Sequence, residues 1–457
     1  MAWQLQRHCM PEIAMTAGQA GDRTTLTTRQ ILVVGVFLVA YVFSFIDRMI
    51  LSLMVEPLRR DLGLTDTQIS LLQGLAFALF YTLVGLPIGR AIDRHSRVRI
   101  AAIGVALWSA MTAISGLAQT YLQLFTARIG VGIGEATLSP AAYSLFADIF
   151  DGRRLGFALG IYNLGSALGA GIAMVLGGAI VQFASGQQAV ILPLLGPVHP
   201  WQLTFFYVGL PGLLVALAIL AVPEPARQHS QAAGLPPAIP VREVLRFAAS
   251  RWRALAGHHL GVAFSNLSAF AAVSWMPAML VRSYHWSIAE AGLAVGIALL
   301  AGGLLGLTGG GWLADRAYAR GSTAGRMRLC LYATLCGIPA GALLGFQPNP
   351  LLAVALFGCV FGFSILPISG AGAALQELTP GELRGQMSAF YLFAINLVGI
   401  GLGSTAVALL SDHVFTQADG IRYSLSVISP LALVIAAGCY WFSLGPVARA
   451  TTSPAAT

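Results

Sequence analysis

Four ionisable residues lie inside long apolar runs of this 457-residue chain, namely Asp47, Arg48, Arg128 and Glu135. A charged side chain inside a membrane-spanning run costs about 2.5–3.5 kcal/mol to insert, so these four should face a cavity or one another. Arg128 and Glu135 are spaced by nearly two helical turns and share a helix face, about 10 Å apart along the axis. Asp47 and Arg48 are neighbours about 100° apart, so one can line a pathway while the other reaches a partner such as Glu135.

This pattern suits a site that couples a proton to the binding of an anion. A carboxylate stays ionised while it pairs with arginine and takes up a proton when the pair opens. We expect Asp47 to be the principal proton carrier and Glu135 a partner or second carrier. Arg48 and Arg128 then neutralise the acids or hold an anionic headgroup. The alternative is a structural ion-pair cluster that fixes two helices together.

The elements that position these residues are apolar runs of membrane-spanning length. The chain is 57% hydrophobic and only 10% charged, with a mean hydropathy of +0.76, which excludes a water-soluble globular protein. We expect an all-α polytopic membrane protein with twelve transmembrane helices. The runs fall near 31–53, 69–91, 98–118, 121–147, 155–183, 203–222, 254–282, 289–313, 327–346, 350–378, 384–411 and 422–446.

The arginines predict the orientation of these helices. Most of the 26 basic residues, all of them arginine, fall in connectors that lie on one side if the N-terminus is cytoplasmic. Only Arg59, Arg60, Arg282 and Arg422 then face outward. We therefore expect a multi-pass protein of the inner (plasma) membrane with both termini in the cytoplasm.

The chain divides at its longest connector. We expect a cytoplasmic tail at 1–30, a six-helix bundle at 31–222, a linker at 223–253, a second six-helix bundle at 254–446 and a cytoplasmic tail at 447–457. Thr27 or Thr28 can cap the first helix. Within the linker, apolar residues recur at helical spacing from Val241 to Trp252 while arginines take another face. This predicts a helix lying in the headgroup layer, either as a plain tether or with a regulatory, lipid-sensing role.

A short motif occurs once in each half. Gly89, Asp93 and Arg94 recur as Gly311, Asp315 and Arg316, all at the same offset of 222 positions. The repeat predicts two bundles of equal orientation related by an axis along the membrane normal. We interpret these loops as a cytoplasmic gate, with Asp148 pairing with Arg94 or Arg97, Glu377 pairing with Arg384, and Arg154 as a further gate residue.

With these motifs the sequence resembles the major facilitator superfamily over essentially its whole length. Phe45–Arg48, Arg128–Ala136 and Ser144–Phe150 are similar to the spinster-type transporters of that superfamily. The resemblance implies gate loops that steady the outward-open state. It also implies proton-coupled transport of lipid-like or amphipathic molecules, such as lysophospholipids or sphingoid phosphates, with Asp47, Arg48, Arg128 and Glu135 carrying the polar chemistry.

Further polar residues are candidates for hydrogen bonding to substrate, although ordinary interhelical bonds explain them equally well: Tyr162, Asn163, Asn266, Trp275, Tyr391 and Asn396. Aromatic residues of the second half, among them Phe270, either line the cavity or pack in the core. We interpret His258 and His259 as a solvated pair at the membrane edge rather than a proton relay.

Other function classes lack support in the sequence. It contains no Walker A loop, HExxH motif, nucleophile elbow or metal-binding cluster, so we expect neither an enzyme nor a metal, and a proton gradient in place of a cofactor. The scattered arginines do not indicate nucleic-acid binding, and we expect a monomer whose partners are protons, a small amphipathic or lipid substrate and the bilayer. The alternatives are an organic-anion symporter, a multidrug efflux antiporter and a non-transporting sensor with a transporter fold.

Overall fold

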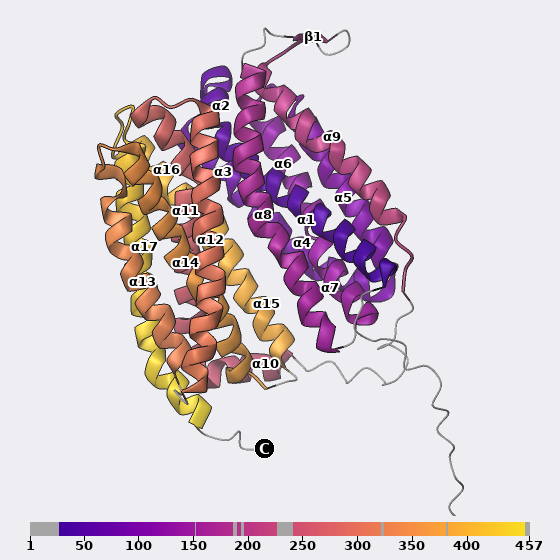
Figure 1. Ribbon diagram of the computed structural model, residues 1–457, viewed down its shortest axis with the longest axis vertical. Coiled ribbons are helices and arrows are strands. Elements are labelled where there is room, and N and C mark those ends of the chain that lie inside the picture. The colour runs from indigo at the N-terminus through magenta and orange to yellow at the C-terminus, as the bar shows by residue number, and fades with distance from the viewer. Residues whose placement is uncertain are drawn as a thin grey trace, which may run out of the picture.

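The computed structural model describes residues 27–150, 152–185, 190–192, 196–225, 241–320, 324–380 and 383–452. These residues form two groups of long helices that lie side by side (Figure 1). In this part of the chain, 11 helical segments are long and apolar enough to cross a membrane. The remaining expected run, the fourth, forms two shorter helices end to end. The predicted 12-helix, two-bundle architecture is thereby confirmed.

The N-terminal half comprises the helices α1 to α9 and a small hairpin. The helices are α1 (Thr28–Leu53), α2 (Val55–Leu62), α3 (Asp66–Gln73), α4 (Leu75–Arg94), α5 (Arg97–Ser115), α6 (Tyr121–Glu135), α7 (Leu138–Ile149), α8 (Gly152–Ser185) and α9 (Pro200–Leu220). Strand β1 (Val190–Leu192) pairs antiparallel with β2 (Gly196–Val198), with Val190 opposite Val198. Thr27 caps α1, as expected, by accepting a hydrogen bond from the N–H of Gln30.

The C-terminal half follows the connector. Its elements are α10 (Val241–Ser250), α11 (Trp252–Tyr284), α12 (Ile288–Ala319), α13 (Gly325–Leu343), η1 (Leu344–Phe346), α14 (Pro350–Leu378), α15 (Arg384–Ala394), the π-helical η3 (Ile395–Gly401), α16 (Leu402–His413) and α17 (Ile421–Thr452). The last helix thus continues beyond its expected end at 446. Most of the expected N-terminal tail, the connector residues 226–240 and the last five positions, 453–457, lie outside the described residues.

Two of the predicted runs are interrupted for identifiable reasons. The fourth breaks between Glu135 and Leu138 because Pro140 has no N–H to donate to the preceding turn. The second breaks at Gly74, where α3 meets α4. A Cβ at Gly74 would lie 2.6 Å from the Ile400 carbonyl oxygen, so only glycine allows the two halves to approach this closely there.

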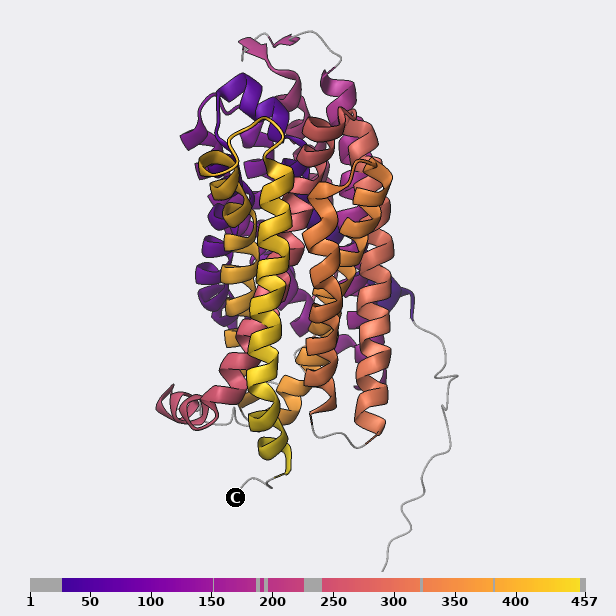
Figure 2. The same cartoon turned by 90° about the vertical axis from the view of Figure 1, so that its left-hand side faces the viewer.

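Helix α10 lies across the axis of the other helices rather than along it (Figure 2). Val244 packs into the core of the C-terminal half with Phe247 beside it, while Arg242 and Arg246 are exposed. Leu245, expected on the apolar face, is exposed, as a residue that contacts lipid would be. The helix is therefore attached to the C-terminal half.

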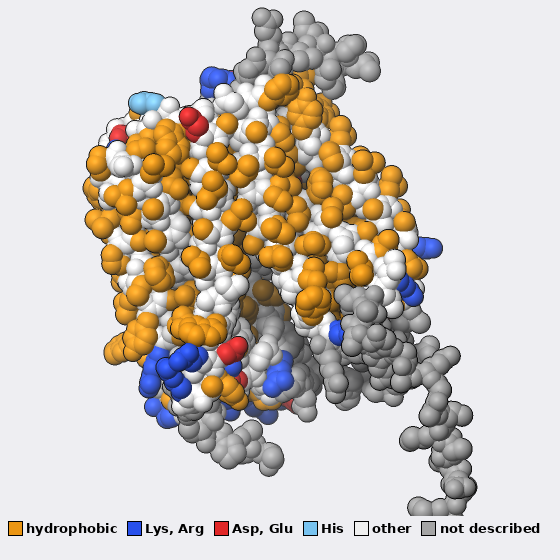
Figure 3. All heavy atoms as spheres, in the orientation of Figure 1, with side chains coloured by type: hydrophobic (Ala, Val, Ile, Leu, Met, Phe, Trp, Pro, Cys, Tyr) orange, Lys and Arg blue, Asp and Glu red, His pale blue; other side chains and the backbone are white. Residues whose placement is uncertain are grey.

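The two halves share one core at the end that carries α2 and have separate cores at the end that carries α10. Near α2, Ile50, Trp275 and Phe357 belong to one continuous apolar cluster. Near α10, the cluster around Phe146 contains N-terminal residues alone and the cluster around Leu375 contains C-terminal residues alone. The helices diverge toward the α10 end, and the surface is hollowed between the halves there (Figures 1 and 3). We call this space the wedge and its closed end, near α2, the apex.

The outer surface has the composition of a membrane protein. Apolar side chains cover the flanks, while arginines gather at the α10 end (Figure 3). Large side chains such as Leu122, Leu305 and Trp441 are about 70% exposed. Such wide apolar exposure is stable only in contact with lipid, which makes this a multi-pass membrane protein.

Candidate functional site

The four charged residues predicted from the sequence meet as two ion pairs. The first joins Arg128 on α6 to Asp47 on α1, with 3.0 Å between Arg128 Nη1 and Asp47 Oδ2. Thr112 on α5 donates a 2.7 Å hydrogen bond to the other oxygen, Asp47 Oδ1. Both charged side chains are about 1–2% exposed. This pair therefore ties three helices together deep within the N-terminal half.

The second pair lies closer to the wedge. Arg48 Nε is 2.6 Å from Glu135 Oε2, and Ser44 donates a 2.7 Å hydrogen bond to the same oxygen. The other carboxylate oxygen, Glu135 Oε1, is buried without a partner among the described residues. The Arg48 side chain keeps 14% of its surface exposed whereas that of Glu135 has none. Of the four, Arg48 thus has the most exposed side chain.

The helix geometry explains this sorting. Asp47 and Arg48 differ by one residue and so point about 100° apart on α1, one toward α5 and the other toward α4. Glu135 is the last residue of α6, and the helix break after it brings its carboxylate toward Ser44 on α1. From the sequence, pairing among the four charged residues could be expected, but the partner of each residue could not be assigned.

Aromatic rings surround the Arg48 guanidinium. Its Cζ lies 4.9 Å from the ring centre of Phe45, 4.5 Å from that of Phe77 and 5.3 Å from that of Tyr81. Such rings stabilise a cation by their quadrupole while leaving its N–H groups free for an anion. Arg48 is therefore held in place even when its carboxylate partner leaves.

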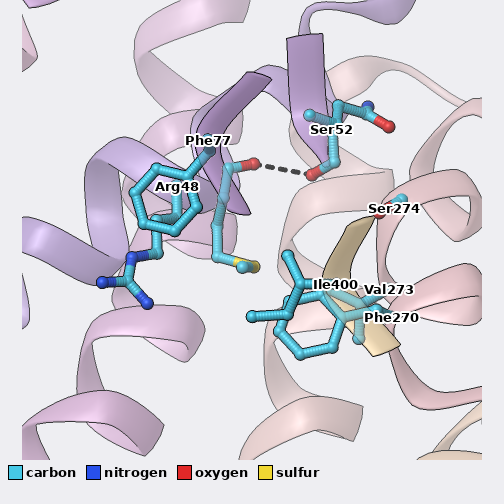
Figure 4. Close-up of a pocket in the computed structure, with 9 residues that line it drawn as sticks. Arg48, Ser52, Phe77, Phe270, Val273, Ser274 and Ile400 are labelled. Carbon is cyan, nitrogen blue, oxygen red and sulfur yellow. Dashed lines mark hydrogen bonds between the residues drawn. The ribbon is translucent and has the colours of Figure 1, made fainter. Parts of the chain in front are cut away.

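A narrow pocket at the apex lies between the two halves. Figure 4 shows Arg48 and Phe77 on one side and Phe270, Val273 and Ile400 on the other. The complete lining is Arg48, Met49, Ser52, Gln73, Phe77, Phe270, Val273, Ser274 and Ile400. Phe270 thus lines the pocket, which agrees with the first of the two alternatives given for the aromatic residues, cavity lining rather than core packing. Arg48 supplies its charge, and most of the remaining surface is apolar.

The apex is closed toward α2 by an ion-pair network across the halves, which we call the clasp (Glu56, Asp66, Arg282 and Asp412). Arg282 at the end of α11 bonds Asp66 on α3 through two nitrogens, at 2.7 and 2.8 Å, and also bonds Glu56 on α2. Asp412 on α16 caps α3 in turn by accepting a 2.7 Å hydrogen bond from the N–H of Thr67. A carboxylate at a helix N-terminus is stabilised by the exposed N–H groups and the helix dipole.

The sequence analysis missed the clasp. It assigned Arg282 to the outer side but gave it no partner, and it did not single out Asp66 or Asp412. These residues lie at the ends of apolar runs, where charged residues are common and therefore do not indicate a functional site. One usable signal was that Asp66 directly follows Thr65, a residue type that often caps helices. This order predicts a helix N-terminus at Asp66, where a carboxylate is stabilised and can also bind a basic side chain from another segment.

At the α10 end, the ion pairs of the proposed gate stay within one half. Asp148 bonds Arg97, one of the two partners expected for Asp148, and Arg97 also bonds Glu224 at 2.9 Å. Burial alone raises the pKa of Glu224, but hydrogen bonds from Ser96, the Val98 N–H and Arg97 bring it below its ordinary value. Glu224 is therefore ionised at neutral pH, and this cluster closes the base of the N-terminal half.

The expected pair between Glu377 and Arg384 is wrong. Glu377 on α14 bonds Arg326 on α13, which also lies 3.9 Å from Asp315. Arg384 donates instead to the carbonyl oxygen of Thr379 at 3.3 Å. The reason is local, because Arg384 begins α15 and its side chain folds back over the preceding turn.

The repeated loops have open surroundings in this conformation. Asp93, Arg94 and Arg316 are exposed, and Arg154 is half-buried. A Cβ added at Gly89 or Gly311 would meet no atom within 4 Å. Glycine at these positions is thus not required by the packing seen here.

This observation gives a first prediction. Gly89→Ala and Gly311→Ala should leave stability unchanged or up to about 1 kcal/mol higher, since alanine favours helix. If the repeated loops form the expected gate, the added methyl group should obstruct its closure, and the transport that the resemblance implies should fall about tenfold. The matched control is Gly438→Ala on α17, where a Cβ also meets nothing. Normal transport by both loop variants would contradict a role of these glycines in closure.

The remaining candidate residues do not line the apex pocket. Tyr162 is buried, stacks on Tyr41 at 4.4 Å and bonds Ser139, while Asn163 accepts from Tyr143. Trp275 is buried and donates to the Ser404 carbonyl oxygen at 2.8 Å. Asn266 packs against Gly399, Asn396 lies in η3 and the Tyr391 hydroxyl is buried without a partner among the described residues.

The expectation for the histidine pair is wrong. His258 is completely buried, and its Nε2–H donates to the carbonyl oxygen of Ala371 on α14 at 2.7 Å. Its Nδ1 lies 3.1 Å from Nδ1 of His259, and the ring of Tyr391 packs on both. His258 is buried because α14 and α15 cover this face of α11, whereas His259 is half-buried. Across the described ranges no group of acidic, histidine or cysteine side chains could hold a metal ion.

Comparisons with known proteins give a consistent result. The family profile described as Major Facilitator Superfamily matches residues 37–404. An MFS-type efflux pump of Mycolicibacterium smegmatis is 29% identical over 417 residues, which cover 90% of this chain and 91% of that protein. A probable L-galactonate transporter of Escherichia coli is 26% identical over 364 residues, covering 77% of this chain and 75% of that protein.

A solved structure is similar over nearly the full length. It is the crystal structure of a bacterial homologue of the human lysosomal transporter spinster, in an inward-facing and unoccupied conformation. The TM-score is 0.83 at 25% sequence identity, and the match covers 94% of this chain and 100% of that chain.

Proposed function

The chain belongs to the major facilitator superfamily of membrane transporters, and on this premise we propose that it is a proton-coupled secondary transporter of amphipathic organic anions. It is not an enzyme, and its structure confirms the spinster-type resemblance. The observation that carries the proposal is the Arg48–Glu135 pair at the apex. Arg48 is the charged residue that a solute reaches, and its partner is a carboxylate that can exchange charge for a proton.

The proposed orientation places the α10 end in the cytoplasm of an inner-membrane protein. Helix α1 begins and α17 ends on the side where the arginines gather, which supports this placement through the positive-inside tendency. With that orientation the wedge opens inward and the clasp closes the outer side. The inward-facing conformation named for the solved relative supports the same assignment.

The coupling follows from charge balance. Asp47, Glu135, Arg48 and Arg128 together carry no net charge, and a buried site is stable only near neutrality. An anion that binds Arg48 displaces Glu135, whose carboxylate is left without a cation in apolar surroundings. Glu135 then takes up a proton and neutrality returns. One anion and one proton are thus bound together and cross in the same step of alternating access.

Asp47 has a supporting part in this scheme. The sequence analysis favoured it as the principal carrier, but its carboxylate is enclosed by Arg128 and Thr112, away from the pocket. Glu135 is better placed because its partner is the exposed Arg48. Asp47 then holds Arg128 and so keeps α1 against α6 while Glu135 changes its protonation state.

The pocket favours an anion with an apolar body. Phe270, Val273 and Ile400 from the C-terminal half lie across the pocket from Arg48 (Figure 4). The hollow between the halves toward the α10 end (Figure 3) would take a longer chain. A lysophospholipid or sphingoid phosphate has this form. The second candidate is a small organic acid, which the similarity to a probable L-galactonate transporter supports. The narrowness of the apex also favours a small head.

The test is proton movement into proteoliposomes that contain the wild type or Arg48→Ala. The added solutes are a lysophospholipid, a sphingoid phosphate, a small carboxylate and a cationic dye. We expect a proton signal with an anionic amphipath that is lost in Arg48→Ala. A signal with the carboxylate alone would favour the second candidate. A signal with the dye alone, or the absence of a signal with all four solutes, would overturn the proposal.

A further inference from the structure

Gln73 stands out at the apex because its polar atoms have nothing to bind. It is the last residue of α3 and lines the same pocket as Arg48. Both Gln73 Nε2 and Gln73 Oε1 are buried, and neither has a hydrogen-bond partner among the described residues. Leaving a buried amide unpaired costs free energy, so such a group in a pocket indicates an absent partner.

A second polar residue faces the same space from the other half. Ser274 on α11 lines the pocket, as does Ser52 on α1 (Figure 4). The Ser52 hydroxyl is already engaged, because it donates to the Met49 carbonyl oxygen at 2.7 Å. The free polar capacity of the uncharged pocket lining therefore comes from Gln73 and Ser274.

The chemistry of these two groups selects an uncharged partner. A primary amide offers donors and an acceptor, and a serine hydroxyl offers one donor with acceptor capacity. A substrate hydroxyl, itself both donor and acceptor, satisfies both. A second carboxylate or phosphate would lack a cation here, since the pocket lining contains Arg48 and no other basic side chain.

The geometry points to Gln73 and Ser274 as a hydroxyl-binding subsite beside Arg48, so that the transported anion carries a hydroxyl close to its acidic group. This inference rests on the proposed function and narrows its substrate class to hydroxylated anions, whether lipid phosphates or free hydroxy acids. Because Gln73 and Ser274 belong to opposite halves, a bound hydroxyl also bridges the halves at the apex.

The experiment compares matched ligands with and without the hydroxyl. Dissociation constants are measured on purified protein for lysophosphatidic acid against its deoxy analogue and for 3-hydroxydecanoate against decanoate. In the wild type we expect the hydroxylated member of at least one pair to bind about tenfold more tightly. In Gln73→Leu and in Ser274→Ala this ratio should fall close to one, with the deoxy ligand bound as before. The pair that responds identifies the source as lipid phosphate or hydroxy acid.

The control carries the same chemical change outside the pocket. Gln119→Leu replaces an exposed glutamine in the turn before α6 and should keep the wild-type ratio. If Gln73→Leu keeps the ratio as well, the amide binds only water and the subsite is overturned while the proposed function stands. If no anion of either pair binds, or if Arg48→Ala binds them as well as the wild type, the proposed function fails and the subsite with it.

Discussion

Replacing Arg282 by alanine is expected to open the outer end of the molecule. Arg282 holds Asp66 from the opposite half, and the Asp66 side chain is only 1% exposed. Removing the cation leaves a buried carboxylate without its main partner, which costs about 3–5 kcal/mol. That cost falls on the conformation with the clasp closed, so the population should shift at least a hundredfold toward the conformation with the clasp open.

The measurement is labelling of a single cysteine at Ser70 by a membrane-impermeant reagent added from the α2 side. Ser70 is buried against Ser404 and Thr405 beneath the clasp, so its labelling reports opening. The matched control is Arg59→Ala. Arg59 also pairs with Asp66, at 3.3 Å, but it belongs to the same half and its side chain is 46% exposed. An equal labelling rate in Arg282→Ala and wild type would show that the clasp does not hold the outer end shut.

The second large effect distinguishes the two acidic residues of the site. Asp47→Asn strips a buried Arg128 of its partner and should lower the free energy of unfolding by about 3–5 kcal/mol. Combining it with Arg128→Gln should restore much of that loss, since no unpaired charge remains. Glu135→Gln should fold normally, because Arg48 is partly exposed and keeps its aromatic neighbours, and should lose proton coupling.

Thermal unfolding and proton flux on the same preparations test this contrast. The conservative exchange is the same for both residues, acid to amide, so a difference in stability reflects the surroundings. If Asp47→Asn unfolds like the wild type but moves no protons, Asp47 is the carrier and the roles assigned to the two acids are reversed.

The sequence was informative where a charged residue lies within an apolar segment. Asp47, Arg48, Arg128 and Glu135 could be identified because charge inside an apolar run is costly and needs a reason. The sequence indicated Glu135 as one possible partner, but it could not assign both pairs, because the pairing depends on how α1 and α6 are rotated toward each other and on the helix break after Glu135. The helices themselves followed from length and hydropathy, which packing in lipid requires of any membrane span.

The clasp and the conformation lay outside the reach of the sequence for a physical reason. Asp66 and Arg282 stand at helix ends, where charged residues cost little and so carry no signal. Gln73 is similar, since an amide at the end of a short helix is unremarkable until both of its polar atoms prove to be unpaired in a pocket. The conformation open at the α10 end and the conformation open at the α2 end are formed by the same residues. The hydrophobic and charge pattern of the sequence therefore does not indicate which of the two is adopted.

The most direct test of the account is the number of protons taken up when the anion binds. Calorimetry of binding in buffers of different ionisation enthalpy gives this number for the purified protein. The account predicts close to one proton per anion in the wild type, with affinity falling up to tenfold per pH unit as the pH rises. Glu135→Gln should bind the anion with no proton uptake and no such pH dependence. Proton uptake that persists unchanged in Glu135→Gln would contradict the exchange of anion for carboxylate at Arg48.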